Sequence, residues 1–123
     1  MIFGIGVDTA DIARVAQSAQ SAAFCARVFG AEEQALFAAA HAHAAAMMAA
    51  NFAAKEAFGK ALGTGLAGFA WPEVQALRRG DGAPYYAFSG EAARTMREKG
   101  LTAHLSLTHE SGLATAFAVL EAR

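Results

Sequence analysis

The sequence contains a single cysteine, Cys25, among its 123 residues. One thiol excludes an internal disulfide and the paired cysteines of a zinc site, and it favours a reducing compartment. The N-terminus does not resemble a signal peptide, because it lacks a basic start and carries an acidic residue at Asp8. No apolar run reaches the ~20 residues that a membrane-spanning helix needs. We therefore expect a cytoplasmic protein with no membrane partner.

An excess of charge of either sign is also missing. Ten Lys and Arg residues nearly balance eleven Asp and Glu residues, and the net charge is -1. This balance gives no general attraction to nucleic acid or to an anionic membrane, so electrostatic recognition must come from local patches. Internal repeats and low-complexity linkers are absent as well. We expect residues 1–123 to form one domain that gains from a partner subunit, since so small a domain buries only about two-thirds of its extended surface.

Hydrophobic periodicity and turn residues predict the order strand, helices, hairpin, helix, hairpin. Strands are expected at residues 1–7, 73–77, 85–88, 102–108 and 113–120. Helices are expected from residue 11, at 21–28, 31–40 and 91–99, and through the alanine-rich segment that ends at Leu62. Asp8 is expected to end the first strand and to cap the helix after it. Adjacent antiparallel strands packed by helices on one side predict an α+β domain with a small antiparallel sheet.

The first candidate site residue is Asp8, which follows Gly4-Ile5-Gly6-Val7 in the first predicted strand. A carboxylate at the end of a buried strand is held by stiff backbone, which suits a hard cation that prefers oxygen ligands. Helix capping is the commoner use of such an aspartate. Asp8 therefore indicates a metal ligand only in combination with other residues.

The central helix carries Glu56 and Lys60 four residues apart, and therefore on one face. A surface ion pair is the simplest interpretation of this spacing. Neighbours rich in alanine and phenylalanine predict partial burial, however, and the helix runs into Gly63-Thr64-Gly65, whose amides and hydroxyl could hold phosphate oxygens. The combination suits a diphosphate. Because the glycines follow the helix, Lys60 must supply the positive charge.

A third polar segment, HLSLTHE, begins at His104 near the end of a predicted strand. Strand alternation places His104 and the two hydroxyl residues after it on one face, and His109 on the other at the edge of the strand. A lone histidine in such a place usually has a structural role. His41 and His43 lie two apart on a helix, on different faces, and are assigned no metal role.

Three segments together resemble the acyl carrier protein synthase family of phosphopantetheinyl transferases, in its short single-domain bacterial form: they are GIGVDTADIARV, FAAKEAFGKALGTG and HLSLTHE. The resemblance covers nearly the whole chain, and the central segment is its most specific part. It implies an α+β fold that assembles as a homotrimer, with coenzyme A in clefts between neighbouring subunits. It also implies transfer of the 4′-phosphopantetheine group of coenzyme A to a serine of apo acyl carrier protein, for fatty acid biosynthesis, with release of adenosine 3′,5′-bisphosphate.

The same resemblance implies roles for individual residues. Asp8 and Glu56 would ligate magnesium, and Lys60 would contact a phosphate of coenzyme A or the reacting centre. Arg14 would face the acidic helix of the carrier protein. The acceptor of the serine proton stays open among Glu56, a water on the magnesium ion and His109. The cofactor site would be lined by Lys60, Gly63, Thr64, Gly65 and His109.

Three positions depart from the family pattern. Asn51 stands where many members carry arginine or another larger residue, Gly30 replaces a frequent threonine before Glu33, and Thr108 replaces a frequent serine. None of these changes removes a proposed ligand. Asn51 does put in doubt any phosphate contact made from its position.

Two other classes of protein stay open at this point. The main alternative is a non-catalytic module that binds coenzyme A or a nucleotide, in which Glu56 and Lys60 merely pair. The other is a purely structural domain that forms trimers and binds no ligand.

Overall fold

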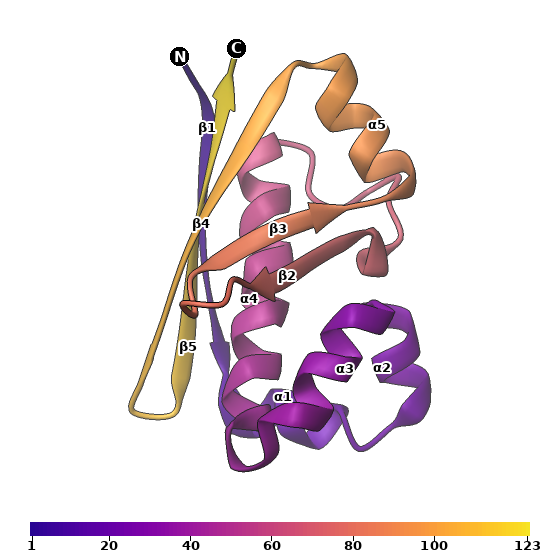
Figure 1. Ribbon diagram of the computed structural model, residues 1–123, viewed down its shortest axis with the longest axis vertical. Helices are drawn as coiled ribbons and strands as arrows, with labels where there is room; N and C mark the ends of the chain where they lie inside the picture. The colour runs from indigo at the N-terminus through magenta and orange to yellow at the C-terminus, as the bar shows by residue number, and fades with distance from the viewer.

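The N-terminal strand β1 (Ile2–Asp11) pairs antiparallel with the last strand, β5 (Leu113–Ala122), which in turn pairs with β4 (Leu101–Glu110). The computed structural model describes residues 1–123, and Figure 1 shows these strands along one side of the molecule with both termini at the same end. The strands β2 (Val74–Arg78) and β3 (Pro84–Phe88) form a separate antiparallel pair. The predicted α+β class is confirmed, with the strands divided between two small sheets.

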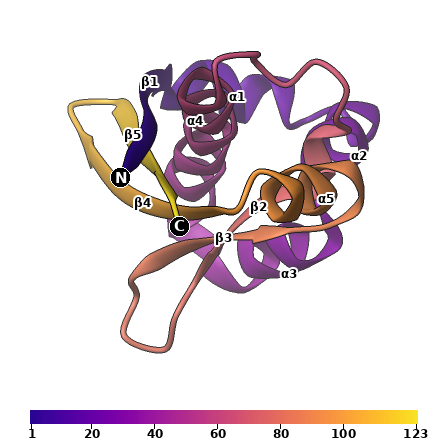
Figure 2. The same cartoon turned by 90° about the horizontal axis from the view of Figure 1, so that it is seen from above.

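The central helix α4 (Ala44–Leu62) packs against one face of the three-stranded sheet, and Figure 2 shows it between that sheet and the rest of the molecule. Gly4 and Gly6 of β1 face this helix. A Cβ atom on either glycine would clash with the main-chain oxygen of Ala61 or Ala57. The absence of side chains at these two positions therefore lets β1 lie directly on α4.

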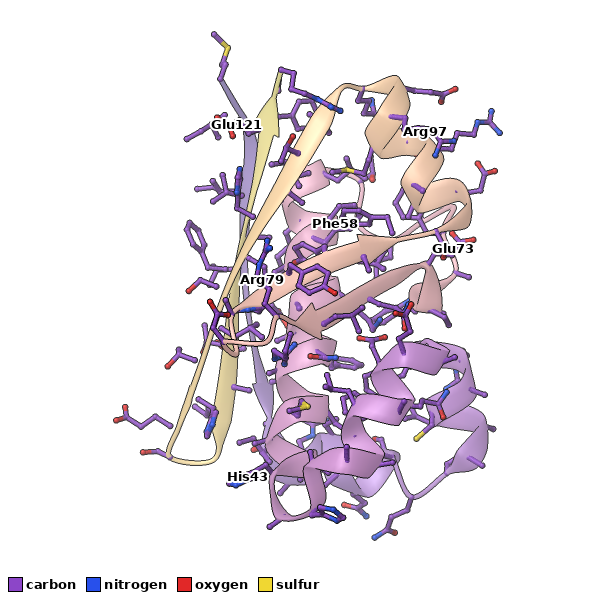
Figure 3. All side chains as sticks on the ribbon, viewed as in Figure 1. His43, Phe58, Glu73, Arg79, Arg97 and Glu121 are labelled. Atoms are coloured by element: carbon purple, nitrogen blue, oxygen red, sulfur yellow. The ribbon has the colours of Figure 1, made fainter.

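The other face of α4 carries the aromatic part of the core. Phe58 is fully buried, and its ring packs against Tyr86 and Phe88 of β3 with centroids 5.6 and 5.0 Å apart. Figure 3 shows Phe58 between α4 and β3. Strands thus cover two opposite faces of α4, so the polar side chains of this helix reach solvent only along the two sides of the helix between those faces.

The remaining helices lie around this core, and the observed bounds agree closely with the predicted ones. They are α1 (Ile12–Ser18), α2 (Ala22–Val28), α3 (Ala31–Ala40), α5 (Gly90–Glu98) and the short 3₁₀ turns η1 (His41–His43) and η2 (Trp71–Glu73). The turn η1 interrupts the alanine-rich segment, which the sequence did not indicate. No helix combines the length and the apolar character required to cross a bilayer.

Two predicted boundaries were wrong. The strand β1 does not end at Asp8, because β5 offers ladder partners as far as Leu113, which pairs with Asp11. Asp11 also replaces Asp8 as the cap of α1, since its Oδ1 accepts a hydrogen bond from the main-chain N–H of Arg14 at 3.1 Å. The strand β4 likewise continues through His109, and the hairpin turns at residues 111–112, which both have positive φ.

Candidate active site

Asp8, Glu56 and Lys60 converge where β1 crosses α4. The ammonium Nζ of Lys60 donates to Asp8 Oδ1 and to the main-chain oxygen of Val7, both at 3.0 Å. The side chain of Lys60 is 54% exposed and that of Asp8 is 21% exposed. The simple Glu56–Lys60 ion pair is not the pair that forms, because Lys60 turns to the strand. Asp8 remains close to Glu56 while Lys60 stays accessible from solvent.

Glu56 lies one turn before Lys60 on α4 and is half-buried. Its pKa is raised above the ordinary value, first by burial and then by the negative charge of Asp8, while Lys60 acts in the opposite direction. The carboxylate of Asp8 on β1 is therefore close enough to that of Glu56 on α4 for the two negative charges to repel each other. Such a pair fits a divalent cation, since Mg²⁺ uses one or two carboxylates and completes its shell with waters and phosphate oxygens. No cluster of three or more His, Cys, Asp or Glu side chains of the kind that holds a metal forms in the chain.

The raised pKa of Glu56 predicts a stability effect. Its ionised form is less favourable in the folded than in the unfolded protein, so Glu56→Gln should raise the melting temperature of the ligand-free protein at pH 7. We expect about 1–3 °C, because the group is partly exposed and screened by solvent. Thermal melts from pH 4 to pH 8 check the sign: the gain should disappear below the ordinary pKa of glutamate, where both states are protonated. Glu110→Gln, at an exposed carboxylate of the β4–β5 hairpin, is the matched control. A lower melting temperature for Glu56→Gln at pH 7 would show that the carboxylate is not destabilised.

The loop Gly63-Thr64-Gly65 follows directly after the end of α4. Gly63 ends the helix with φ of 89°, and the N–H of Gly65 returns to the main-chain oxygen of Gly59 at 3.0 Å. A Cβ atom on Gly59 would lie 2.8 Å from the main chain of Gly65. Gly59, which the sequence analysis did not single out, therefore lets the loop fold back onto the helix beside Lys60.

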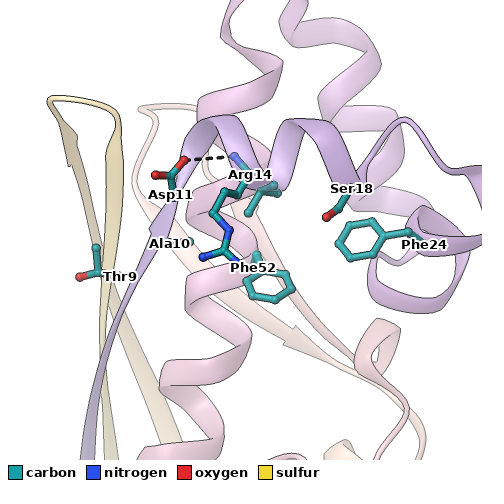
Figure 4. Close-up of a pocket in the computed structure, with 8 residues that line it drawn as sticks. Thr9, Ala10, Asp11, Arg14, Ser18, Phe24 and Phe52 are labelled. Atoms are coloured by element: carbon teal, nitrogen blue, oxygen red, sulfur yellow. Dashed lines mark hydrogen bonds between the residues drawn. The ribbon is translucent and has the colours of Figure 1, made fainter.

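Arg14 lies at a hollow of about 290 Å³, the Arg14 hollow, next to Asp8 along β1. The hollow is lined by Thr9, Ala10, Asp11, Arg14, Val15, Ser18, Phe24 and Phe52. Figure 4 shows the Arg14 side chain directed toward Phe52, with Phe24 on the far side of the hollow. The site thus combines one exposed cation with two half-buried rings. Sequence reasoning found Arg14 but missed both rings, because apolar residues at helical spacing look like core.

His109 lies apart from this cluster within one chain. It belongs to β4, and β5 separates β4 from β1, so two strand spacings, about 10 Å, lie between the strand of His109 and that of Asp8. His109 lines a second hollow of about 230 Å³, the basic hollow, together with His43 and Arg78. Its side chain is on the α4 face of the sheet, opposite to that of His104, as alternation predicted.

Comparison with known proteins finds relatives that match nearly the whole chain. Residues 4–118 match the family described as the 4′-phosphopantetheinyl transferase superfamily. A holo-(acyl-carrier-protein) synthase of Aromatoleum aromaticum is 45% identical over 126 residues, with 100% of each chain covered. The synthase of Clavibacter sepedonicus is 42% identical, over 98% of this chain and 97% of that protein.

Solved structures of holo-(acyl-carrier-protein) synthases also have the same fold as this chain. The crystal structure of the synthase from Neisseria meningitidis has a TM-score of 0.90 at 31% identity, and covers 98% of this chain and 99% of that one. The synthase from Bacillus anthracis, described in complex with CoA (3′,5′-ADP), has a TM-score of 0.84 at 27% identity, with 100% and 99% covered. Within the superfamily, the chain belongs to the acyl carrier protein synthase family.

Proposed function

We propose that this protein, acting as one domain over residues 1–123, transfers the 4′-phosphopantetheine group of coenzyme A to a serine of apo acyl carrier protein for fatty acid biosynthesis. The main support is the convergence of Asp8, Glu56 and Lys60 beside a glycine loop, in a chain 45% identical to a holo-(acyl-carrier-protein) synthase. Intact-mass analysis tests the proposal. The enzyme should add about 340 Da to an apo carrier protein when coenzyme A and magnesium are supplied, the mass of one phosphopantetheine arm moved as a phosphoryl group. A module that only binds coenzyme A would leave the carrier mass unchanged.

Asp8 and Glu56 are the residues that we assign to magnesium. When bound, the ion would neutralise the diphosphate of coenzyme A and stabilise charge on the leaving oxygen. Lys60 would hold Asp8 in place through the bond at 3.0 Å and present its one remaining N–H to a phosphate oxygen. Gly63, Thr64 and Gly65 would shape the adjoining side of the cofactor site.

The chemical step follows from these positions. The serine oxygen of the carrier attacks the β-phosphorus of coenzyme A, and a new bond between oxygen and phosphorus forms. The bond from this phosphorus to the bridging oxygen breaks, and adenosine 3′,5′-bisphosphate leaves. The serine proton passes to a base, and burial and the charge of Asp8 raise the pKa of Glu56, so its carboxylate accepts a proton more readily than an ordinary exposed glutamate does.

A homotrimer is the assembly that we propose. The sheet face turned away from α4 exposes apolar side chains in a row on β1 and β5: Ile5 is 58% exposed, Val7 54% and Phe117 43%. A contiguous apolar face of this kind indicates a protein interface. Because β5 separates His109 from Asp8 within one chain, we propose that His109 belongs to a site shared between subunits, in which it lies beside the Asp8 cluster of a neighbouring copy.

Disrupting this face should dissociate the protein. Phe117→Glu buries a charge in the proposed interface and is expected to reduce the mass measured by light scattering to that of one chain, 12.7 kDa, with loss of activity. Arg97→Glu is the control, because Figure 3 shows Arg97 on α5, away from the outer face that carries Glu121. A Phe117→Glu variant with an unchanged mass would contradict the interface.

We propose that the carrier protein docks at the Arg14 hollow, which predicts a selective kinetic defect. Arg14→Glu reverses the charge at its edge, so the kcat/KM for the carrier should fall about tenfold or more while the KM for coenzyme A stays within about twofold. Steady-state kinetics with each substrate varied in turn check this expectation. Arg94→Glu, on the exposed surface of α5, should change neither value. Equal losses for both substrates would show that Arg14 does not face the carrier.

A further inference from the structure

The basic hollow on the β4 side of α4 is lined by three basic side chains, one hydroxyl and apolar residues. His43 comes from η1, Arg78 from β2, and Thr108 and His109 from β4, and the remaining lining residues are apolar. No carboxylate lines it. A hollow of about 230 Å³ with a guanidinium, two imidazoles and a hydroxyl has the size and donors to hold a phosphate group with part of the molecule attached to it.

Arg78 is held rigidly at this hollow. Its Nη2 donates to Asn51 Oδ1 at 2.8 Å, and its Nη1 donates to the main-chain oxygens of Ala76 and Leu77 at 3.3 and 3.2 Å. These bonds occupy three of the five N–H groups of a guanidinium. The N–H of Nε and one N–H of Nη2 have no partner in the chain and are available to a ligand.

The orientation of Asn51 is itself determined by a buried network. Asn51 is completely buried, and its Nδ2 donates to Glu33 Oε2 and to the main-chain oxygen of Ala76, both at 2.9 Å. With both amide hydrogens used, Oδ1 is the atom presented to Arg78. The carboxylate of Glu33 also pairs with Lys55 at 2.7 Å. Its negative charge acts on Arg78 as well: burial lowers the pKa of Arg78, and the charge of Glu33 raises it in part, which favours the charged guanidinium.

We propose that Arg78, oriented by Asn51, recognises the 3′-phosphate monoester at the ribose of coenzyme A. In this chain the guanidinium for that phosphate comes from β2, and Asn51 of α4 serves as its holder instead of contacting the ligand. Asparagine at position 51 therefore does not leave the phosphate without an arginine, because Arg78 takes that role. The inference rests on the proposed function, since the hollow of one subunit would face the nucleotide end of a coenzyme A molecule whose diphosphate lies at Asp8 and Lys60 of the next.

A binding experiment with the whole chain measures how much the 3′-phosphate contact contributes to affinity, apart from the other contacts of the ligand. Isothermal titration is performed with coenzyme A and with 3′-dephospho-coenzyme A, which differ only in the phosphate concerned. Arg78→Gln removes the charge but keeps an amide that can still donate to Asn51, which protects the fold. We expect this variant to bind coenzyme A about tenfold or more weakly, and 3′-dephospho-coenzyme A within about twofold of the unaltered protein. Arg78→Lys, which keeps the charge without the fork, should lose part of the discrimination.

The neighbouring arginine is the matched control. Arg79 is exposed, stacks on the Tyr85 ring at 5.2 Å and does not line the hollow, and Figure 3 shows it at the β2–β3 hairpin. Arg79→Gln should leave both affinities within about twofold. Equal weakening of both ligands by Arg78→Gln, or unchanged binding of coenzyme A, would overturn the assignment. Failure of the unaltered protein to bind either ligand would instead contradict the proposed function.

The product supplies a second pair of ligands that lacks the pantetheine arm. Adenosine 3′,5′-bisphosphate should lose affinity for Arg78→Gln by the same factor as coenzyme A, and adenosine 5′-phosphate should not. If both nucleotides lose affinity equally, Arg78 contacts the 5′-phosphate or acts only on the fold, and the proposal is wrong.

Discussion

Replacing Asp8 with asparagine is expected to lower kcat/KM for phosphopantetheinyl transfer about a thousandfold or more, while the protein keeps its fold. Asparagine has nearly the same shape, and β1 is fixed by its pairing with β5, so the backbone should not move. The change removes one of the two charges assigned to magnesium and weakens the bond that holds Lys60. Both losses act on charge that develops in the transition state, where electrostatic terms are largest. Steady-state kinetics over a magnesium titration measure the effect, and residual activity should need a higher magnesium concentration.

The control for this variant is an aspartate with a purely local role. Asp81 Oδ1 accepts a hydrogen bond from the main-chain N–H of Ala83 at 2.9 Å in the β2–β3 hairpin. Asp81→Asn should therefore leave kcat/KM and the magnesium dependence unchanged. An Asp8→Asn enzyme with nearly full activity, or with a loss that is independent of magnesium, would refute the assignment of Asp8 as a ligand.

The second large effect is expected in stability. Lys55 and Glu33 are completely buried and pair at 2.7 Å, and Lys55 also donates to the main-chain oxygens of Trp71 and Val74 at 3.2 and 2.5 Å. Lys55→Met leaves the Glu33 carboxylate buried without its cation. The free energy of unfolding should fall by about 3–5 kcal/mol, because an uncompensated buried charge is costly. Urea denaturation followed by circular dichroism measures the loss.

A double variant distinguishes stability lost through the broken ion pair from stability lost through poorer packing. Adding Glu33→Gln to Lys55→Met removes the stranded charge, so part of the lost stability should return. Lys99→Met, at an exposed position after α5, should change the free energy of unfolding by less than about 0.5 kcal/mol. A loss below about 1 kcal/mol for Lys55→Met alone would mean that water or another group compensates Glu33.

The candidate site illustrates which features a sequence can reveal. Glu56 and Lys60 are recognisable because their spacing is a property of one helix, and the α+β class follows from elements that local periodicity defines. The pairing of Lys60 with Asp8 could not be predicted, because it depends on how closely β1 approaches α4. Asp8 and Asp11 offer equivalent caps three residues apart, and only the ladder with β5 decides between them.

The network around Arg78 was hidden for a similar reason. Asn51 and Glu33 are 18 residues apart, and Arg78 is 27 residues beyond Asn51. No periodicity connects the three. The sequence comparison with the family indicated that position 51 was unusual, but only the fold shows which residue stands next to it. Polar contacts between distant segments are therefore the part of such a site that requires coordinates.

The contact of Gly4 and Gly6 with α4 limits how this protein can be engineered. Replacing glycines to make the unfolded chain less flexible is a common route to heat-resistant enzymes, gaining about 0.4–1 kcal/mol at a compatible site. Gly80, which has open space around it, suits this strategy. At Gly4 or Gly6 even one methyl group would clash with the main chain of α4, and the resulting shift of β1 would move Asp8 away from Glu56. Tolerance to heat and competence for catalysis are therefore opposed at these two positions of the first strand.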